Sequence, residues 1–250
     1  MTSSTAGPAP ETAAEPPNWP GTDPGHRDGN PATLTDLVLR TAAELGLPLP
    51  APEADSWERT AEFRTADGRR AVVRVFRDDH CYLVQCRGTE AWLAYGRTTD
   101  PAAATRAAAA WAGGADLRRT QEEAPFLDIQ AWAFAHEREP LDAVELAWRQ
   151  RLDSVRQPPW DRRPRVRTLV EAAFDQPALR RLTPVTSHYI LWFSSSPSLP
   201  YARVGCSIDP HHNGKYGVRD RGEIVARTDT AEEAVALAVA ALPPHLRSAD

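Results

Sequence analysis

Two stretches of the chain, one near its beginning and one near its end, alternate apolar with polar residues and are divided by turn signals. Alternation puts every second side chain on one face of a β-strand, so each stretch predicts a half-buried sheet. The first stretch predicts strands at Trp57–Arg64, Ala71–Arg77, Cys81–Cys86 and Ala91–Arg97. Strands joined by such short turns pair with their chain neighbours, which predicts an antiparallel meander.

The second stretch predicts a similar meander, with strands at Tyr189–Phe193, Tyr201–Ile208, Lys215–Arg219 and Glu223–Arg227. Tyr189–Phe193 is apolar in both alternations, which is typical of a central strand that is covered on both faces. Asn213-Gly214 is a strong hairpin signal between the second and third of these strands. Both ends of the chain are therefore expected to form four-stranded sheets.

Helices are predicted before, between and after the two sets of strands. Thr33 with Asp36 resembles the capping pair of a first helix. Asp100 caps an alanine-rich helix after the first four strands, and Thr230 caps a similar helix after the second four. Because each set of strands leads into such a helix, we interpret the chain as an internal repeat of two ββββα units.

The predicted fold class is α+β: two antiparallel four-stranded meander-plus-helix units joined by a helical middle segment, after a disordered N-terminal tail. The tail is rich in Pro, Ala, Thr and Gly and cannot bury enough surface to offset its ordering entropy. The predicted divisions are 1–31 for the tail, 32–114 for the first helix and ββββα unit, 115–182 for the helical connecting segment and 183–247 for the second unit. Residues 32–247 are expected to form one compact fold.

Composition narrows the classes of function. The hydrophobic fraction of 42% supports a core, and the net charge of −5 argues against a nucleic-acid or membrane-surface binder. The chain has neither a signal-peptide pattern nor an apolar run of about 20 residues, so we expect a cytoplasmic protein without a membrane partner. Cys81, Cys86 and Cys206 are too few for a disulfide framework and are interpreted as reduced thiols.

Two histidine-containing segments are candidates for chemistry. His188 begins the predicted central strand, where it would act as a base or orient a ligand, or simply form a hydrogen bond at a strand end. His136, Glu137 and Arg138 end a predicted helix, where they would serve acid–base work or anion binding, or complement the exposed carbonyls of the helix terminus. Both interpretations of each segment stay open.

Other polar and aromatic groups have plainer interpretations. His211-His212 lack a third ligand of evident spacing, so no metal site is predicted. Residues 149–181 hold nine arginines and four acids, which fits a solvated helical face better than a phosphate-binding surface. Six tryptophans on apolar faces are predicted core residues: Trp57, Trp92, Trp111, Trp132, Trp148 and Trp192. Without a P-loop, G-x-G-x-x-G or G-x-S-x-G motif, no cofactor is predicted.

Several segments resemble an uncharacterised actinobacterial family that carries the label "natural product biosynthesis protein" on a domain of unknown function. The resemblance covers about residues 34–245. It is carried by Arg74-Val75-Phe76-Arg77, Thr98-Thr99-Asp100, Ala135-His136-Glu137-Arg138 with Trp148-Arg149, and Ser187-His188-Tyr189 through Phe193-Ser194. The chain departs from the family at Glu139, where the usual residue before proline is glycine. The resemblance implies a link to secondary metabolism and gives no catalytic residues.

Three hypotheses of function follow. The first is an accessory or binding protein of natural product biosynthesis, with a small molecule or a biosynthetic protein as partner. The second is an enzyme with a histidine-based site in a cleft between the two halves. The third is an immunity-like or regulatory interaction protein with an exposed apolar patch. The catalytic residues are unknown, and the candidate ligand-binding residues are His188, Tyr189, Trp192, Tyr201, His136, Glu137 and Arg138.

Overall fold

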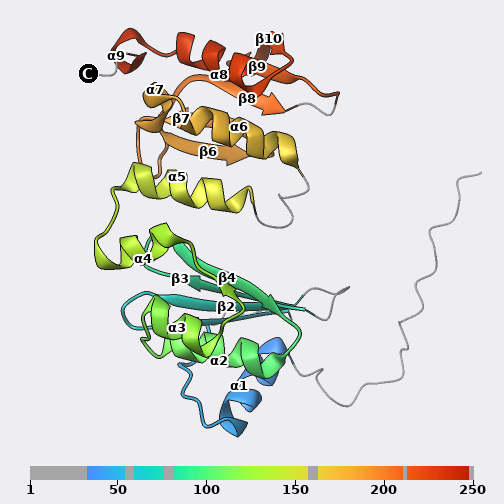
Figure 1. Cartoon of the computed structure of the whole chain (residues 1–250), viewed down its shortest axis with the longest axis vertical. Coiled ribbons are helices and arrows are strands. Elements are labelled where there is room, and N and C mark those ends of the chain that lie inside the picture. Colours follow the sequence, from blue (N-terminus) through green and yellow to red (C-terminus); the bar gives the residue numbers. More distant parts are fainter. Residues whose placement is uncertain (1–32, 54–58, 76–80, 157–162, 211–212, 248–250) are drawn as a thin grey trace, which may run out of the picture. The chain divides into compact units, whose positions relative to one another are not determined.

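Two antiparallel sheets organise the computed structural model, which describes residues 33–53, 59–75, 81–156, 163–210 and 213–247 (Figure 1). In the first sheet the five strands lie side by side in chain order. They are β1 (Thr60–Arg64), β2 (Arg70–Val75), β3 (Tyr82–Arg87), β4 (Trp92–Thr98) and β5 (Leu127–Asp128). The predicted meander is therefore confirmed, and a short fifth strand extends it.

The second sheet is also a five-stranded antiparallel meander. Its strands are β6 (Thr183–Ser187), β7 (Ile190–Ser194), β8 (Arg203–Pro210), β9 (Tyr216–Asp220) and β10 (Glu223–Thr228). The α+β class is confirmed, while the prediction of four strands in each sheet is wrong. The strands that pattern reasoning missed are β5 and β6, which lie at the sheet edges.

Helices precede, connect and follow the sheets. They are α1 (Leu34–Glu44), α2 (Pro101–Ala112), α3 (Leu117–Glu123), α4 (Ala131–Arg138), α5 (Ala143–Ser154), α6 (Pro164–Phe174), α7 (Pro177–Arg180), α8 (Ala231–Ala240) and α9 (Pro244–Arg247). The predicted caps are present: Thr33 and Thr230 each form a capping box, and the Asp100 side chain accepts from the Ala102 amide at 2.8 Å. Within the described ranges, no helix combines the length and apolarity needed to cross a membrane.

Each sheet has its own hydrophobic core. The first core packs α1 and the small alanine face of α2 on the first sheet. The second core packs α6 and α8 on the second sheet. Helix α5 contributes to both, because Leu146 belongs to the first core and Trp148, two residues later, belongs to the second. Successive residues on a helix point in different directions, so one helix can serve two cores.

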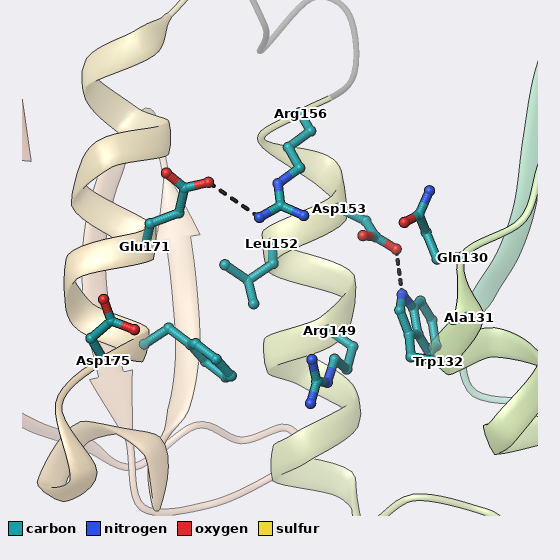
Figure 2. A pocket seen from close by; sticks show the side chains of 10 residues that line it. Gln130, Ala131, Trp132, Arg149, Leu152, Asp153, Arg156, Glu171 and Asp175 are labelled. Carbon is teal, nitrogen blue, oxygen red and sulfur yellow. Dashed lines mark hydrogen bonds and ion pairs between the residues drawn. The ribbon is translucent and has the colours of Figure 1, made fainter.

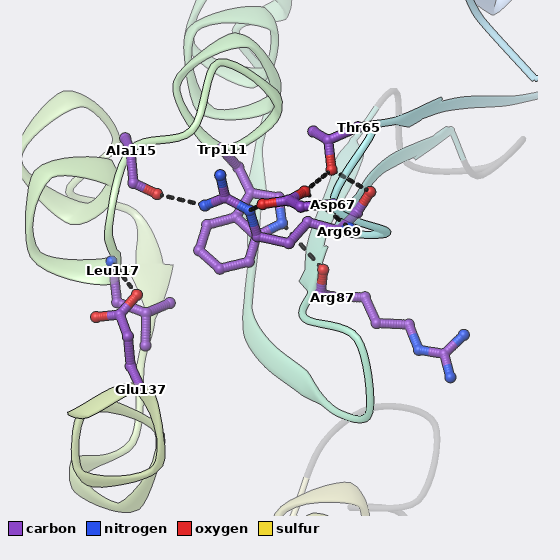
Figure 3. A network of polar contacts seen from close by, with 8 residues as sticks. All are labelled: Thr65, Asp67, Arg69, Arg87, Trp111, Ala115, Leu117 and Glu137. Atoms are coloured by element: carbon purple, nitrogen blue, oxygen red, sulfur yellow. Dashed lines mark hydrogen bonds and ion pairs between the residues drawn. The ribbon is translucent and has the colours of Figure 1, made fainter. Parts of the chain in front are cut away.

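Tryptophans hold several of these elements together. Trp111 at the end of α2 is buried, donates from Nε1 to the Arg87 carbonyl at 3.1 Å and lies under the Arg69 guanidinium (Figure 3). Trp148 is buried and donates to the Leu182 carbonyl at 3.0 Å. Trp132 and Trp192 are half-buried. The core prediction is wrong for Trp92, a residue that is 39% exposed at the start of β4.

Some predictions fall outside the described residues, namely those for the tail at 1–31, for Trp57 and for His211-His212. The three cysteines, Cys81, Cys86 and Cys206, are free thiols in the structure. Both sheets are meanders followed by a helix, and the origin of this similarity in an internal repeat stays a prediction.

Candidate functional site

The first group of predicted site residues lies in the last turn of α4, where each side chain contacts backbone. His136 Nδ1 accepts the Leu141 amide at 3.1 Å. Glu137 Oε1 accepts the Leu117 amide at 2.9 Å, at the start of α3 (Figure 3). Arg138 Nε donates to the carbonyl of its own helix at 3.3 Å. These contacts fit the interpretation of the segment as a helix terminus that satisfies backbone groups.

The second group lies on the second sheet. His188 and Tyr189 form the tight turn between β6 and β7, with φ of 49° and 75°, and His188 is exposed. The Arg163 guanidinium lies 3.7 Å from the centroid of the Tyr189 ring. Trp192 and Tyr201 pack edge to face with centroids 5.8 Å apart. The structure therefore brings Trp192 and Tyr201 together and places His188 in a turn.

His188 is remote from Tyr201 along the sheet. Tyr201 lines a cavity together with Thr183 at the first residue of β6, whereas His188 follows the last residue of that strand. Five residue steps along a strand span about 16 Å. His136 belongs to neither place, since it contacts the loop between α4 and α5. The predicted residues thus occupy separate positions.

A first cavity, of about 380 Å³, lies between α4, α5 and α6 (Figure 2). Both arginines that line it form ion pairs within the chain. Arg149 pairs with Glu145 at 2.6 Å, and Arg156 pairs with Glu171 at 3.2 Å. Because each arginine already has a counter-charge, neither needs an anionic ligand to neutralise it.

Two carboxylates that line this first cavity, those of Asp175 and Asp153, form no ion pair among the described residues, and of the two Asp153 has a hydrogen-bond donor. Its carboxylate accepts a hydrogen bond from Trp132 Nε1 at 2.5 Å. Burial raises the pKa of Asp153, and the Trp132 hydrogen bond offsets part of that rise. The hydrogen bond from the Trp132 indole is therefore the strongest contact that favours the ionised form of Asp153.

A second cavity, of about 610 Å³, is lined by α5, the start of β6, the β3–β4 turn and the loop between β7 and β8. Two buried polar atoms on its lining residues have no hydrogen-bond partner within the described part of the chain: Arg151 Nε and Thr183 Oγ1. Thr183 is only 3% exposed. The Arg151 guanidinium also forms no ion pair with any described residue.

The charge of Arg151 makes this second cavity the candidate site. Burial lowers the pKa of Arg151, and the nearby Tyr201 phenol acts in the opposite direction. An arginine stays protonated at neutral pH, so the cavity holds a mostly buried positive charge. A buried charge without a partner is costly, and a bound anion would remove that cost.

Pattern reasoning missed Arg151 and Thr183, although Arg151 carries a signal. It lies three residues after Trp148 and four before Val155, both of which are buried in the second core. A charge at these spacings stands at the border of the apolar stripe of a helix. Thr183 has no comparable signal, because its strand was not predicted.

Residues 142–249 match a family model described as "Family of unknown function (DUF6193)". No curated protein and no solved structure matches the chain. The matched region begins at Asp142, the residue that caps α5 by accepting the Val144 and Glu145 amides at 3.0 and 3.1 Å. It therefore holds α5, the whole second core and most of the lining of the second cavity.

The remaining wall of the second cavity comes from the first sheet, through Glu90 and Trp92. These residues precede the matched region. Across the described ranges, no group of three or more His, Cys, Asp or Glu side chains is arranged to hold a metal ion. The second cavity presents the Arg151 cation, the Thr183 hydroxyl and the rings of Trp92 and Tyr201.

Proposed function

We propose that the protein binds a small organic anion in the second cavity, with Arg151 as the anchor. The observation that carries this proposal is the guanidinium of Arg151, which is mostly buried in the cavity wall without a counter-charge or hydrogen bond from the described chain. A carboxylate matches the fork of a guanidinium with two parallel hydrogen bonds. The Thr183 hydroxyl, also unpartnered, would donate a further one.

The size of the cavity supports a small-molecule ligand. Sites for small molecules occupy about 300–1,000 Å³ and combine apolar walls with a few polar groups. The second cavity has about 610 Å³, and Leu146, Pro184 and Pro197 give it apolar surface beside Arg151. The site thus favours an organic acid over a bare inorganic ion.

We further propose that the protein is an accessory binding protein of natural product biosynthesis in the cytoplasm of an actinobacterium. The resemblance to the actinobacterial family supports the role in natural product biosynthesis. The alanine- and arginine-rich composition supports the actinobacterial origin. A binding role is favoured over a histidine-based enzyme because His136 Nδ1 and Glu137 Oε1 each accept a backbone amide. Because both atoms already accept hydrogen bonds from the backbone, neither is free to accept a proton from a substrate.

The test is thermal unfolding of the full chain with acetate, benzoate or inorganic phosphate, against chloride at matched ionic strength. An anion at ten times its Kd stabilises the folded state by about 1.4 kcal/mol. We expect a carboxylate to raise the Tm of the wild type and of Arg118→Met, an exposed arginine outside the cavity. Arg151→Met should remove the rise. An equal rise in Arg151→Met would contradict the proposal.

A further inference from the structure

The second cavity also contains a negative charge. Glu90 lies in the turn between β3 and β4, lines the cavity and is exposed. It forms no hydrogen bond or ion pair with any residue that the structure describes. The two opposite charges of the cavity, Glu90 and Arg151, therefore do not neutralise each other directly. Each is available to a ligand group of opposite sign.

Aromatic rings stand beside this free carboxylate. Trp92 is two residues after Glu90, lines the same cavity and is 39% exposed. The Trp92 ring already forms a cation–π contact within the chain, because the Arg87 guanidinium lies 5.7 Å from its centroid. Tyr201, also 39% exposed, lines the cavity from the loop between β7 and β8. A carboxylate with an exposed indole is the combination that recognises an ammonium group.

We propose that the ligand of the second cavity is a zwitterion, whose carboxylate binds Arg151 and Thr183 and whose ammonium group binds Glu90 and Trp92. The chemical class is an amino acid or a short amino-terminated acid. This inference rests on the proposed function and adds an ammonium group to the proposed organic anion. It makes the turn between β3 and β4 a specificity element, although that turn lies outside the region matched by the family model.

Charge balance is the reason to prefer a zwitterion to a simple acid. An anion bound at Arg151 would leave the Glu90 carboxylate without a partner and would bring a second negative charge into the same cavity. Like charges brought together at a binding site disfavour a ligand, and this is a common source of specificity. A zwitterion compensates both side chains while remaining neutral overall. Its apolar spacer would contact Leu146 and Pro184, which line the same cavity.

The experiment uses matched probes that differ by one charged group. The first set is tryptophan, indole-3-propionate, which lacks the ammonium group, and tryptamine, which lacks the carboxylate. The second set, with a longer spacing, is 6-aminohexanoate, hexanoate and hexylamine. Kd values are measured by calorimetry for the full-length wild type, Glu90→Gln, Trp92→Leu and Arg151→Met. Glu44→Gln, an exposed glutamate on α1 outside the cavity, is the control.

We expect at least one zwitterion to bind the wild type about tenfold more tightly than its partner without the ammonium group. Glu90→Gln should abolish this preference while leaving the binding of the simple acid unchanged or tighter. Trp92→Leu should reduce the preference, and Glu44→Gln should keep it. Glu90 and Trp92 are exposed, so their variants are expected to fold, and unchanged unfolding curves would verify this.

The possible failures separate the two proposals. If the simple acids bind as tightly as the zwitterions, and Arg151→Met abolishes their binding, the zwitterion is overturned and the organic-anion site stands. If binding of every probe is independent of Arg151, both proposals are overturned. The same conclusion follows if none of the six probes binds.

Discussion

Arg151, the proposed anchor of the ligand, illustrates how a binding residue can cost stability. Its guanidinium is held in the wall of the second cavity, and its Nε has no partner in the described chain. Leaving a buried polar group unsatisfied costs about 1–3 kcal/mol. Such a residue is expected at a ligand-binding site, because the bound ligand supplies the missing hydrogen bonds and so stabilises the folded state.

Replacement of Arg151 should therefore stabilise the ligand-free protein. Arg151→Met keeps much of the apolar stem and removes the charge, so we expect the free energy of unfolding to rise by about 1–3 kcal/mol. Urea unfolding monitored by tryptophan fluorescence measures it. Arg151→Lys is the control, since it retains a buried cation and should give no comparable gain. A loss of stability in Arg151→Met would show that the guanidinium already has a favourable environment.

Asp153 predicts a pH dependence of stability. Burial raises its pKa above the ordinary value of 3.8, and the hydrogen bond from Trp132 and the charge of Arg156 lower it in part. The ionised carboxylate is therefore less favourable in the folded than in the unfolded chain. This group stabilises the fold below pH 3.8, and that contribution is lost as pH rises through the folded pKa.

Asp153→Asn tests this dependence because the amide oxygen can still accept from Trp132 Nε1. We expect the variant to be more stable than the wild type at neutral pH, with the difference disappearing below pH 3.8. Urea unfolding at a series of pH values gives the difference directly. A variant that is less stable than the wild type at neutral pH would contradict the prediction, because it would mean that the ionised carboxylate is favourable in the folded chain.

Among the elements, α3 depends on a contact from another helix. Glu137 on α4 accepts the Leu117 amide, one of the first amides of α3, which have no partner within their own helix (Figure 3). We expect Glu137→Ala to lower the free energy of unfolding by about 1 kcal/mol, as for other lost helix caps. Glu137→Gln keeps an acceptor oxygen and should be nearly neutral. Equal losses in both variants would mean that the charge matters more than the hydrogen bond.

Elements with a local signal were predictable from the sequence. The caps at Thr33, Asp100 and Thr230 were predicted because one side chain and its helix determine them. Strand β6 was missed because it contains Pro184, which interrupts a strand pattern and is tolerated here since β6 is an edge strand. Strand β5 has only two residues and depends on Gly96. A Cβ at Gly96 would lie 2.5 Å from the Phe126 carbonyl.

The candidate site was harder to predict than the fold. Arg151, Thr183 and Glu90 come from a helix, an edge strand and a turn that are far apart in the chain. No motif links them, so only the tertiary structure brings them to one cavity. The histidines stood out by residue type alone, and the structure places them in a helix terminus and a turn.

At the scale of the whole molecule, the two hydrophobic cores meet at α5. Every buried residue of the second core lies between Trp148 and Leu242. The first core ends with Leu146, its single buried member on α5. The region matched by the family model, 142–249, therefore contains a complete core and its first helix. A segment that contains its own core is expected to fold as an independent unit.

A fragment spanning residues 142–250 should therefore fold cooperatively, whereas one spanning 163–250 should not. The shorter fragment lacks Trp148, Leu152 and Val155, and loss of the tryptophan alone costs about 3–5 kcal/mol, a large part of the 5–15 kcal/mol that stabilises a domain. Near-ultraviolet circular dichroism and thermal unfolding measure whether each fragment has fixed tertiary structure and unfolds cooperatively.

Leu146→Gln is the matched variant for this experiment. It should destabilise the full chain, where Leu146 is buried in the first core, and leave the longer fragment unaffected. If the longer fragment lacks fixed tertiary structure, the first core is needed to fold the second, and the two sheets form a single cooperative unit.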